Sequence, residues 1–247
     1  MFFSKDTIPQ LIFRVAILLF LGSVTPSPGF SFEQQRTALL PGTDVQAGQL
    51  IVVVDETLEN SKTELYTFEK SGKGWQKQCG PLPAMIGWKG LAPPGEKREG
   101  DGRTPSGLYP LEFAFGYAGA IDSKMPYRQS TENDLWVDDP NAPDYNTWVK
   151  RGQTGAASFE SMKLNDHRYR VGISIGYNRS PVVKGLGSAI FLHIWLKEGA
   201  TTQGCVAIEE RELIRILQWL DPKKKPMILM GTRACISETA GIVLPGP

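Results

Sequence analysis

Glycine and proline interrupt this chain so often that little of it can form long helices. Between residues 79 and 119 one or the other occurs every few positions, which favours short strands joined by ordered loops. Two runs of strand length, 50–54 and 65–68, flank a polar turn and predict a hairpin. Later strands are expected at residues 169–177, 189–195 and 227–230. The sequence therefore predicts a mainly β domain.

One segment has the periodicity of a helix. In residues 209–220, leucines recur at helical spacing at positions 213, 217 and 220, and Pro222 follows the pattern closely. Isoleucine at position 214 widens the apolar stripe. We therefore expect this helix to pack one face on the β domain. The sequence has no recognisable internal repeat and no recognisable second domain.

Residues 190–208 carry the groups needed for acyl-transfer chemistry. An apolar strand contains His193, and the turn Thr202-Gln203-Gly204-Cys205 follows it. A cysteine needs a nearby base to become a thiolate, and a glycine beside it lets main-chain N–H groups approach a developing oxyanion. These residues indicate a cysteine acyl-transfer enzyme. Spacing alone leaves open the alternative that Cys205 is a small core residue and His193 a satisfied polar group.

The order of motifs around this pair resembles the L,D-transpeptidase catalytic domain, the YkuD-like family of bacterial cell-wall enzymes. In that family a histidine at the end of a strand precedes a Ser/Thr-x-Gly-Cys turn whose cysteine is the nucleophile, which matches His193 and Cys205 here. The resemblance runs from about Cys79 to Gly231 and is closest to a branch with several further motifs. The matching segments are residues 97–107, 136–140 with 145–146, 176–178 and 187–193.

The chain departs from the commoner family pattern at two positions. Ile194 stands where a glycine usually follows the histidine, and Ala207 stands where an arginine usually lies two residues after the cysteine. The missing arginine leaves open how a substrate carboxylate or the carbonyl of the acyl donor is held.

The resemblance implies a mainly β fold, a sandwich or barrel-like domain with one or a few packed helices. It implies that Cys205 attacks a peptide carbonyl in a peptidoglycan stem peptide, that His193 donates and accepts the proton, and that the N–H groups of Gly204 and Cys205 stabilise the oxyanion. The family acts after the diaminopimelate of a tetrapeptide and releases D-alanine, and an amine of a neighbouring stem peptide resolves the thioester. Thr202 is expected either to orient the turn or to contact the substrate.

Two alternatives to a transpeptidase stay open. The same acyl-enzyme passed to water would make the protein an L,D-carboxypeptidase or endopeptidase, since acceptor choice depends on how the site excludes water and positions an amine. A catalytically idle cell-wall-binding protein that keeps the fold is the second alternative. No cofactor is expected, and no metal either, because the cysteines and histidines lack the close spacing of a zinc site.

Other polar and aromatic residues have a structural interpretation beside a functional one. Arg98 or Arg103 is a candidate for holding a substrate carboxylate, although the turn around them is expected to be structural. Asp138 and Asp139 resemble paired carboxylates, but neighbours on an extended segment point to opposite faces, which favours a structural role. His167 lies in a charged stretch and is expected at the surface. Four tryptophans are candidates for a groove or for the core: Trp88, Trp136, Trp148 and Trp195.

The termini and the charge indicate where the protein acts. Lys5 and Arg14 precede a short apolar run, and small residues and prolines follow up to Gly29. We expect export to the periplasm or cell wall, with an uncleaved inner-membrane anchor as the alternative and no other membrane contact. The 27 basic and 26 acidic residues give a net charge of +1, so nucleic-acid binding is not expected. The expected divisions are 1–29 signal peptide, 30–47 tether, 48–235 catalytic domain and 236–247 C-terminal tail.

Three cysteines in an oxidising compartment allow at most one disulfide. If Cys79 and Cys235 paired, Cys205 would be the free thiol that the motif requires. The sequence leaves that pairing open.

Overall fold

The structure, a computed structural model, describes residues 46–244 of the chain. The predicted signal peptide and nearly all of the predicted tether lie outside these residues. In chain order the elements are β1 (Gln49–Asp55), β2 (Lys62–Ser71), β3 (Gly74–Met85), β4 (Leu91–Ala92), β5 (Thr104–Pro105), β6 (Gly107–Gly116), β7 (Tyr127–Gln129), β8 (Asp134–Val137), β9 (Trp148–Lys150), β10 (Phe159–Ser161), β11 (Val171–Ile175), β12 (Phe191–Ile194), β13 (Val206–Ile208), α2 (Glu210–Trp219), the 3-10 helix η2 (Pro222–Lys224), β14 (Met227–Thr232) and α3 (Arg233–Ala240).

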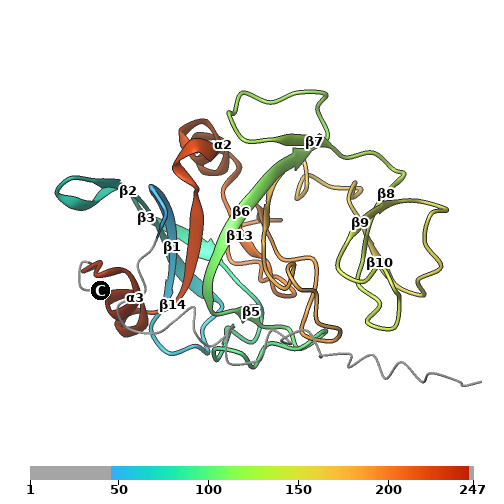
Figure 1. The fold of residues 1–247 in the computed structure, drawn as a ribbon, viewed down its shortest axis with the longest axis horizontal. Coiled ribbons are helices and arrows are strands. Elements are labelled where there is room, and N and C mark those ends of the chain that lie inside the picture. Colours follow the sequence, from blue (N-terminus) through green and yellow to red (C-terminus); the bar gives the residue numbers. More distant parts are fainter. Residues whose placement is uncertain (1–45, 245–247) are drawn as a thin grey trace, which may run out of the picture.

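Most of these strands form one sheet that closes on itself (Figure 1). The pairing order is β11-β12-β13-β3-β2-β1-β14-β6-β7, and β11 also pairs with β6, so the strands from β11 to β6 make a barrel. Strands β12 and β13 run parallel, as do β1 and β14. Of the two shapes that the sequence left open, the fold is the barrel, and closure removes edges that an open sheet would expose.

The predicted strands and the predicted helix are confirmed, with some shorter than expected. The runs 50–54, 65–68 and 227–230 lie within β1, β2 and β14. Strand β12 begins only at Phe191 because Ala189 has a φ of 52°, in the left-handed region rather than the β region. The expected helix is α2, which ends at Trp219 because Leu220 is already extended.

β1 shows why the barrel is stable. All seven of its residues are buried, because both of its faces are covered. Ile51 and Val53 point into the barrel core, whereas the alternate positions 50, 52 and 54 pack outside with Ile236 of α3. A strand buried on both faces is an unbroken apolar run in the sequence, as residues 50–54 are.

The barrel core continues into α2. Leu213, Ile216 and Leu217 are buried on one face of the helix and belong to the same cluster as the barrel interior. The helix contacts β11 and β12. It therefore braces the part of the barrel that carries His193.

A second, three-stranded sheet lies beside the barrel, to the right in Figure 1. It is formed by β10, β8 and β9 within residues 131–164, a segment that we call the outer lobe. The lobe packs aromatic side chains on the outside of the barrel: the ring centroids of Trp136 and Phe191 are 5.0 Å apart, at an interplanar angle of 79°. Phe115 of β6 packs on Phe191 in the same edge-on way. The space between barrel and lobe is where the candidate site lies.

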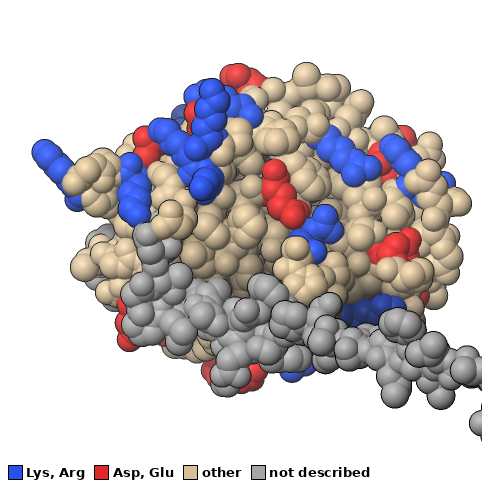
Figure 2. Space-filling view, in the orientation of Figure 1, with Lys and Arg blue, Asp and Glu red and all other residues tan. Residues whose placement is uncertain are grey.

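Cys79, Cys205 and Cys235 are all free thiols in the structure. The predicted boundary at residue 235 falls inside α3. Within residues 46–244, no helix is long and apolar enough to cross a membrane. Basic and acidic side chains are interspersed on the face shown in Figure 2.

Candidate active site

The alternation of β12 and β13 places the two predicted catalytic residues on one face. Leu192 and Ile194 point into the barrel core, as do Val206 and Ile208 opposite them, so the residues between these face outward. His193 pairs with Ala207 in the parallel register, and Cys205 lies just before the start of β13. Both His193 and Cys205 line one pocket of about 450 Å³ on the outside of the barrel.

Cys205 is a buried thiol with backbone partners. Its Sγ donates to the carbonyl oxygen of Ala189 at 3.2 Å and accepts from the N–H of Phe191 at 3.4 Å. Burial, reinforced by the negative charge of Glu160, raises the pKa of the thiol to about 12. In the resting state Cys205 is therefore a neutral thiol at neutral pH.

His193 is also neutral, and one of its nitrogens is fixed. The ring nitrogen Nδ1 lies 2.8 Å from the carbonyl oxygen of Ile194, an acceptor, so we assign the ring proton to Nδ1. Burial lowers the pKa of His193 to about 4. Nε2 is thus left unprotonated as a base. The group that fixes the tautomer is a backbone carbonyl, which leaves no trace in a sequence.

The Thr202–Cys205 turn is held by hydroxyl groups. Thr202 Oγ1 donates to the carbonyl oxygen of Cys205 at 2.7 Å and accepts from the N–H of Gly204 at 3.1 Å. Thr104 Oγ1 also donates to that carbonyl, at 3.1 Å. These bonds favour the turn-orienting role of Thr202. They also engage the Gly204 N–H, which the resemblance had assigned to the oxyanion, with Thr202 instead.

Gly204 is needed for a steric reason. Its φ is +149°, and a Cβ at this position would lie 2.9 Å from the carbonyl oxygen of Arg103. A larger residue would therefore push the turn away from the loop beneath it.

The carbonyl that accepts from Cys205 is itself positioned by the outer lobe. Asn146 Oδ1 accepts from Trp136 Nε1 at 2.8 Å and from the N–H of Ala189 at 3.2 Å. Ala189, in its left-handed conformation, then presents its carbonyl oxygen to Cys205. The family motifs at 136–140, 145–146 and 187–193 thus meet behind the thiol.

Two pocket residues were missed by the sequence analysis as site residues. Tyr169 is 3% exposed, and its hydroxyl donates to Glu160 Oε1 at 2.5 Å. Its ring centroid lies 5.2 Å from that of His193, at an interplanar angle of 75°. In the sequence, Tyr169 was only the start of a predicted strand and Glu160 had no motif of its own, so nothing linked either residue to Cys205.

Some of the other polar candidates line the pocket, and others lie away from it. Arg98 donates to the carbonyl of Gly95 and Arg103 to that of Leu91 in β4, and neither arginine lines the pocket. Asp138 lines the pocket, whereas Asp139 accepts from the N–H groups of Asn141 and Ala157 away from it, as the opposite-face argument predicted. His167 Nε2 lies 3.0 Å from the carbonyl oxygen of Trp195 and is half-buried.

The four tryptophans have different positions. Trp195 lines the pocket, and Trp88 is 51% exposed. Trp136 is fully buried in the aromatic cluster between the outer lobe and the barrel, and Trp148 packs against it. Only Trp195 is therefore part of the candidate site itself.

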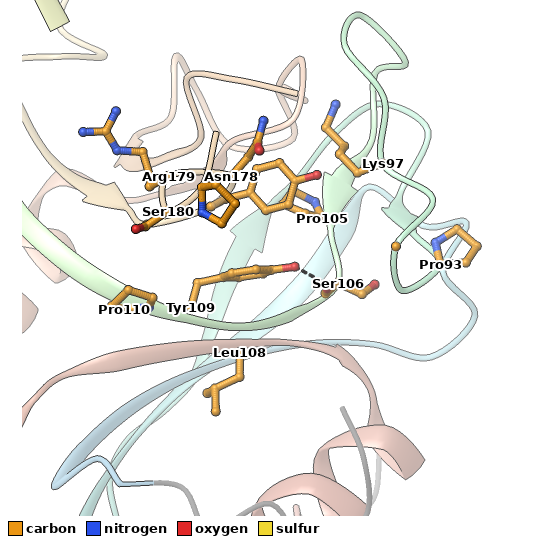
Figure 3. Close-up of a pocket in the computed structure, with 14 residues that line it drawn as sticks. Pro93, Lys97, Pro105, Ser106, Leu108, Tyr109, Pro110, Asn178, Arg179 and Ser180 are labelled. Atoms are coloured by element: carbon orange, nitrogen blue, oxygen red, sulfur yellow. Dashed lines mark hydrogen bonds between the residues drawn. The ribbon is translucent and has the colours of Figure 1, made fainter. Parts of the chain in front are cut away.

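The two cations of the pocket are already paired. Lys97 Nζ lies 2.6 Å from Asp101 Oδ1, and Arg168 forms a bidentate pair with Asp166. Lys97 also lines a second pocket, whose wall contains Tyr109 and Tyr177 with their rings nearly perpendicular. The Tyr109 hydroxyl donates to the carbonyl of Ser106 there (Figure 3). Lys97 therefore lines both cavities, and its Nζ bonds to the carbonyl of Arg98 and to Asp101.

The fold and the site together define a barrel whose outer face carries a neutral cysteine and histidine pair in one pocket. The chain matches the model of the YkuD family, the L,D-transpeptidase catalytic domain, over residues 50–232. It belongs to that family, whose members are cysteine transpeptidases that act on the cell wall. No curated protein matches the chain significantly.

Two solved structures resemble the chain at low sequence identity. Bd1075 from Bdellovibrio bacteriovorus is 19% identical, with a TM-score of 0.37, and the match covers 77% of this chain and 50% of that one. Pgp2 from Campylobacter jejuni, a helical cell shape determining protein, is 14% identical, with a TM-score of 0.37, and the match covers 82% of this chain and 55% of that one. The chain thus spans about half the length of each.

Proposed function

We propose that this protein is a peptidoglycan L,D-transpeptidase in which Cys205 forms a thioester with a stem peptide and passes the acyl group to an amine. The observation that carries the proposal is the shared pocket of Cys205 and a neutral His193 whose Nε2 is free to act as a base. Membership of the YkuD family supports the reaction class and the cell-wall substrate.

The first step follows from the charges of the two residues. Because the pKa of Cys205 is about 12 and that of His193 about 4, a resting thiolate–imidazolium pair is disfavoured. His193 Nε2 therefore takes the thiol proton as Sγ attacks the carbonyl carbon. The thiol must first turn away from the Ala189 carbonyl that it now faces.

The tetrahedral intermediate needs a donor for its oxyanion. We assign this role to the Cys205 N–H, since the Gly204 N–H is already donated to Thr202. The imidazolium of His193 then protonates the departing amine as the C–N bond breaks, which leaves the thioester and the neutral histidine. His193 accepts a proton from the incoming amine as the new amide bond forms and the C–S bond breaks, and it returns this proton to the departing sulfur, which restores the neutral thiol and the neutral histidine.

The substrate follows from the family and not from the pocket. We propose a tetrapeptide stem that loses its terminal D-alanine. Ala207 replaces the arginine common in the family, and the pocket cations Lys97 and Arg168 are paired with Asp101 and Asp166. Substrate carboxylates would therefore have to compete with these pairs. Transfer to water remains the second outcome, with the same acyl-enzyme.

The proposed location is the periplasm or cell wall, where stem peptides are found. It is supported by the family and by the N-terminal sequence pattern.

Intact-protein mass spectrometry with a purified disaccharide tetrapeptide tests this function. We expect a thioester adduct on the mature protein and none on Cys205→Ala, with Cys235→Ala as the matched control that still reacts. Crosslinked dimers and free D-alanine in the same tube would establish transfer to an amine. Trimmed monomers alone would make the protein a hydrolase, and an adduct that persists in Cys205→Ala would refute the assignment of the nucleophile.

A further inference from the structure

A carboxyl group and a phenol lie side by side in the pocket wall next to the proposed nucleophile. Glu160 comes from β10 of the outer lobe, and Tyr169 from the segment just before β11 of the barrel. The Tyr169 hydroxyl donates to Glu160 Oε1 at 2.5 Å, and both residues line the pocket of Cys205. This bond joins the lobe to the barrel at the site. The mechanism above uses neither residue.

Tyr169 lies beside both members of the proposed pair. Its ring packs edge-on against His193 at 5.2 Å and belongs to the buried cluster that contains Cys205. Burial and the negative charge of Glu160 raise the pKa of the Cys205 thiol, whereas the Tyr169 hydroxyl lowers it. One hydroxyl proton therefore has two possible acceptors, the carboxylate and the thiolate.

We propose that Glu160 is a positioning residue that acts through Tyr169: when ionised it holds the Tyr169 hydroxyl, and when protonated it releases that hydroxyl to the sulfur of Cys205. The proposal rests on the proposed function for its consequence, because the sulfur it controls is the nucleophile there. Only hydrogen bonds change. Protonated Glu160 donates to the Tyr169 oxygen, and the Tyr169 O–H then donates to the thiolate.

The surroundings of Glu160 place this change near neutral pH. Burial is the largest effect on the pKa of Glu160, and it raises that pKa together with the negative charges of Asp138 and Glu99. These effects outweigh the hydrogen bond from Tyr169 and the charge of Arg168, so the pKa of Glu160 is raised to about 7. Lys97 also faces the pocket and favours the Cys205 thiolate. Below about pH 7 Glu160 is thus protonated and favours formation of the Cys205 thiolate. Above that pH Glu160 is ionised and opposes formation of the thiolate.

The test is the pH profile of Cys205 alkylation by iodoacetamide, measured on the full chain by peptide-resolved mass spectrometry between pH 5 and 9. For the unaltered protein we expect the rise with pH to flatten above about pH 7, near the pKa of Glu160. Glu160→Gln removes the charge and keeps the shape, so the flattening should vanish and the rate at pH 8 should rise about tenfold, the effect of one pKa unit. Tyr169→Phe removes the donor, so it should slow alkylation by about tenfold below pH 7, where the hydroxyl is released to the sulfur, and change it little above pH 7.

The double variant separates a relay from two independent effects. If Glu160 acts through Tyr169, then most of the effect of Glu160→Gln should disappear in the Tyr169→Phe background. Glu132→Gln, on the exposed side of the lobe, and Tyr127→Phe, away from the pocket, are the matched controls and should leave the profile unchanged. Thermal melts report whether each variant is folded.

The outcomes are distinct from those of the proposed function, because alkylation needs no peptide substrate. Profiles that overlay that of the unaltered protein in both folded single variants would overturn the proposal, as would additive effects in the double variant. If one single variant fails to fold, the profile of the other decides. Shifted profiles together with no reaction on the tetrapeptide would keep the positioning role of Glu160 and refute the transpeptidase.

Discussion

The barrel interior and the outer face that it presents to the lobe differ in chemistry although they share the same strands. The interior cluster is built mainly of aliphatic side chains, such as Leu192 and Val206. The outer cluster is aromatic and also contains Cys205, with His193 and Asp134 buried close by. β12 supplies residues to both, in alternation. The interior therefore fixes the position of the strand, and the outer face of the same strand carries titratable groups.

The largest effect is expected from removing the sulfur of Cys205 on the outer face. Cys205→Ala should abolish the acyl-enzyme and change the free energy of unfolding by only about 1 kcal/mol, because a single buried sulfur is removed. Mass spectrometry with the tetrapeptide and urea denaturation measure the two quantities. A large loss of stability would mean that Cys205 is mainly a structural core residue, and the proposed difference between the two faces would then be wrong.

The next effect concerns the base. His193→Ala should slow acyl-enzyme formation by about 10²–10⁴-fold, the usual contribution of a positioned base, with the barrel intact. Single-turnover kinetics with the same substrate measure it. His167→Ala, at a histidine that hydrogen-bonds the Trp195 carbonyl, is the matched control. Equal rates in the His193 variant and the unaltered protein would remove this residue from the mechanism.

A change on the inward face of the same strand should lower the stability and leave Cys205 reactive. Leu192 is fully buried in the barrel core and is the direct neighbour of His193. Leu192→Ala should lower the free energy of unfolding by about 2–5 kcal/mol through lost burial and the cavity left behind. Molecules that remain folded should still be alkylated at Cys205. Urea denaturation combined with alkylation at low urea tests this, and an unchanged stability would show that the core is not continuous here.

The smallest effect tests how the outer lobe is held. Burial alone would raise the pKa of Asp134, but hydrogen bonds from Lys150, Thr131 and Trp148 outweigh it and lower the pKa to about 2. A lowered folded pKa stabilises above the unfolded value of 3.8 and loses this stabilisation as the pH falls towards 2. Asp134→Asn should therefore cost about 2 kcal/mol at pH 7 and much less near pH 2.

Urea denaturation of Asp134→Asn at pH 7 and near pH 2 measures this change in the free energy of unfolding. Asp166→Asn is the control, because its carboxylate pairs with Arg168 at a partly exposed site where an ion pair contributes little. A cost that does not change with pH would mean that Asp134 acts through packing alone and that the lobe is held by the same kind of forces as the barrel interior.

Much of the fold was predictable because its signals are local. The unbroken apolar run at 50–54 and the leucine spacing in 209–220 predicted β1 and α2, and the motif order predicted the family. The alternation of side chains along β12, which puts Leu192 on the inward face and His193 on the outward face, also follows from the sequence. Spacing could not show that Gly204 donates its N–H to Thr202, since that bond depends on the turn conformation.

What the sequence determined by itself is the set of reactive groups and the family, because a thiol, an imidazole and a glycine turn in that order are chemically distinctive. The tertiary structure alone decided that the sheet closes into a barrel, that the Ile194 carbonyl fixes the tautomer of His193, and that Glu160 and Tyr169 stand beside Cys205. The reason is physical: backbone carbonyls are the same at every position of a sequence, and Glu160 meets Cys205 only through the folding of a separate lobe onto the barrel.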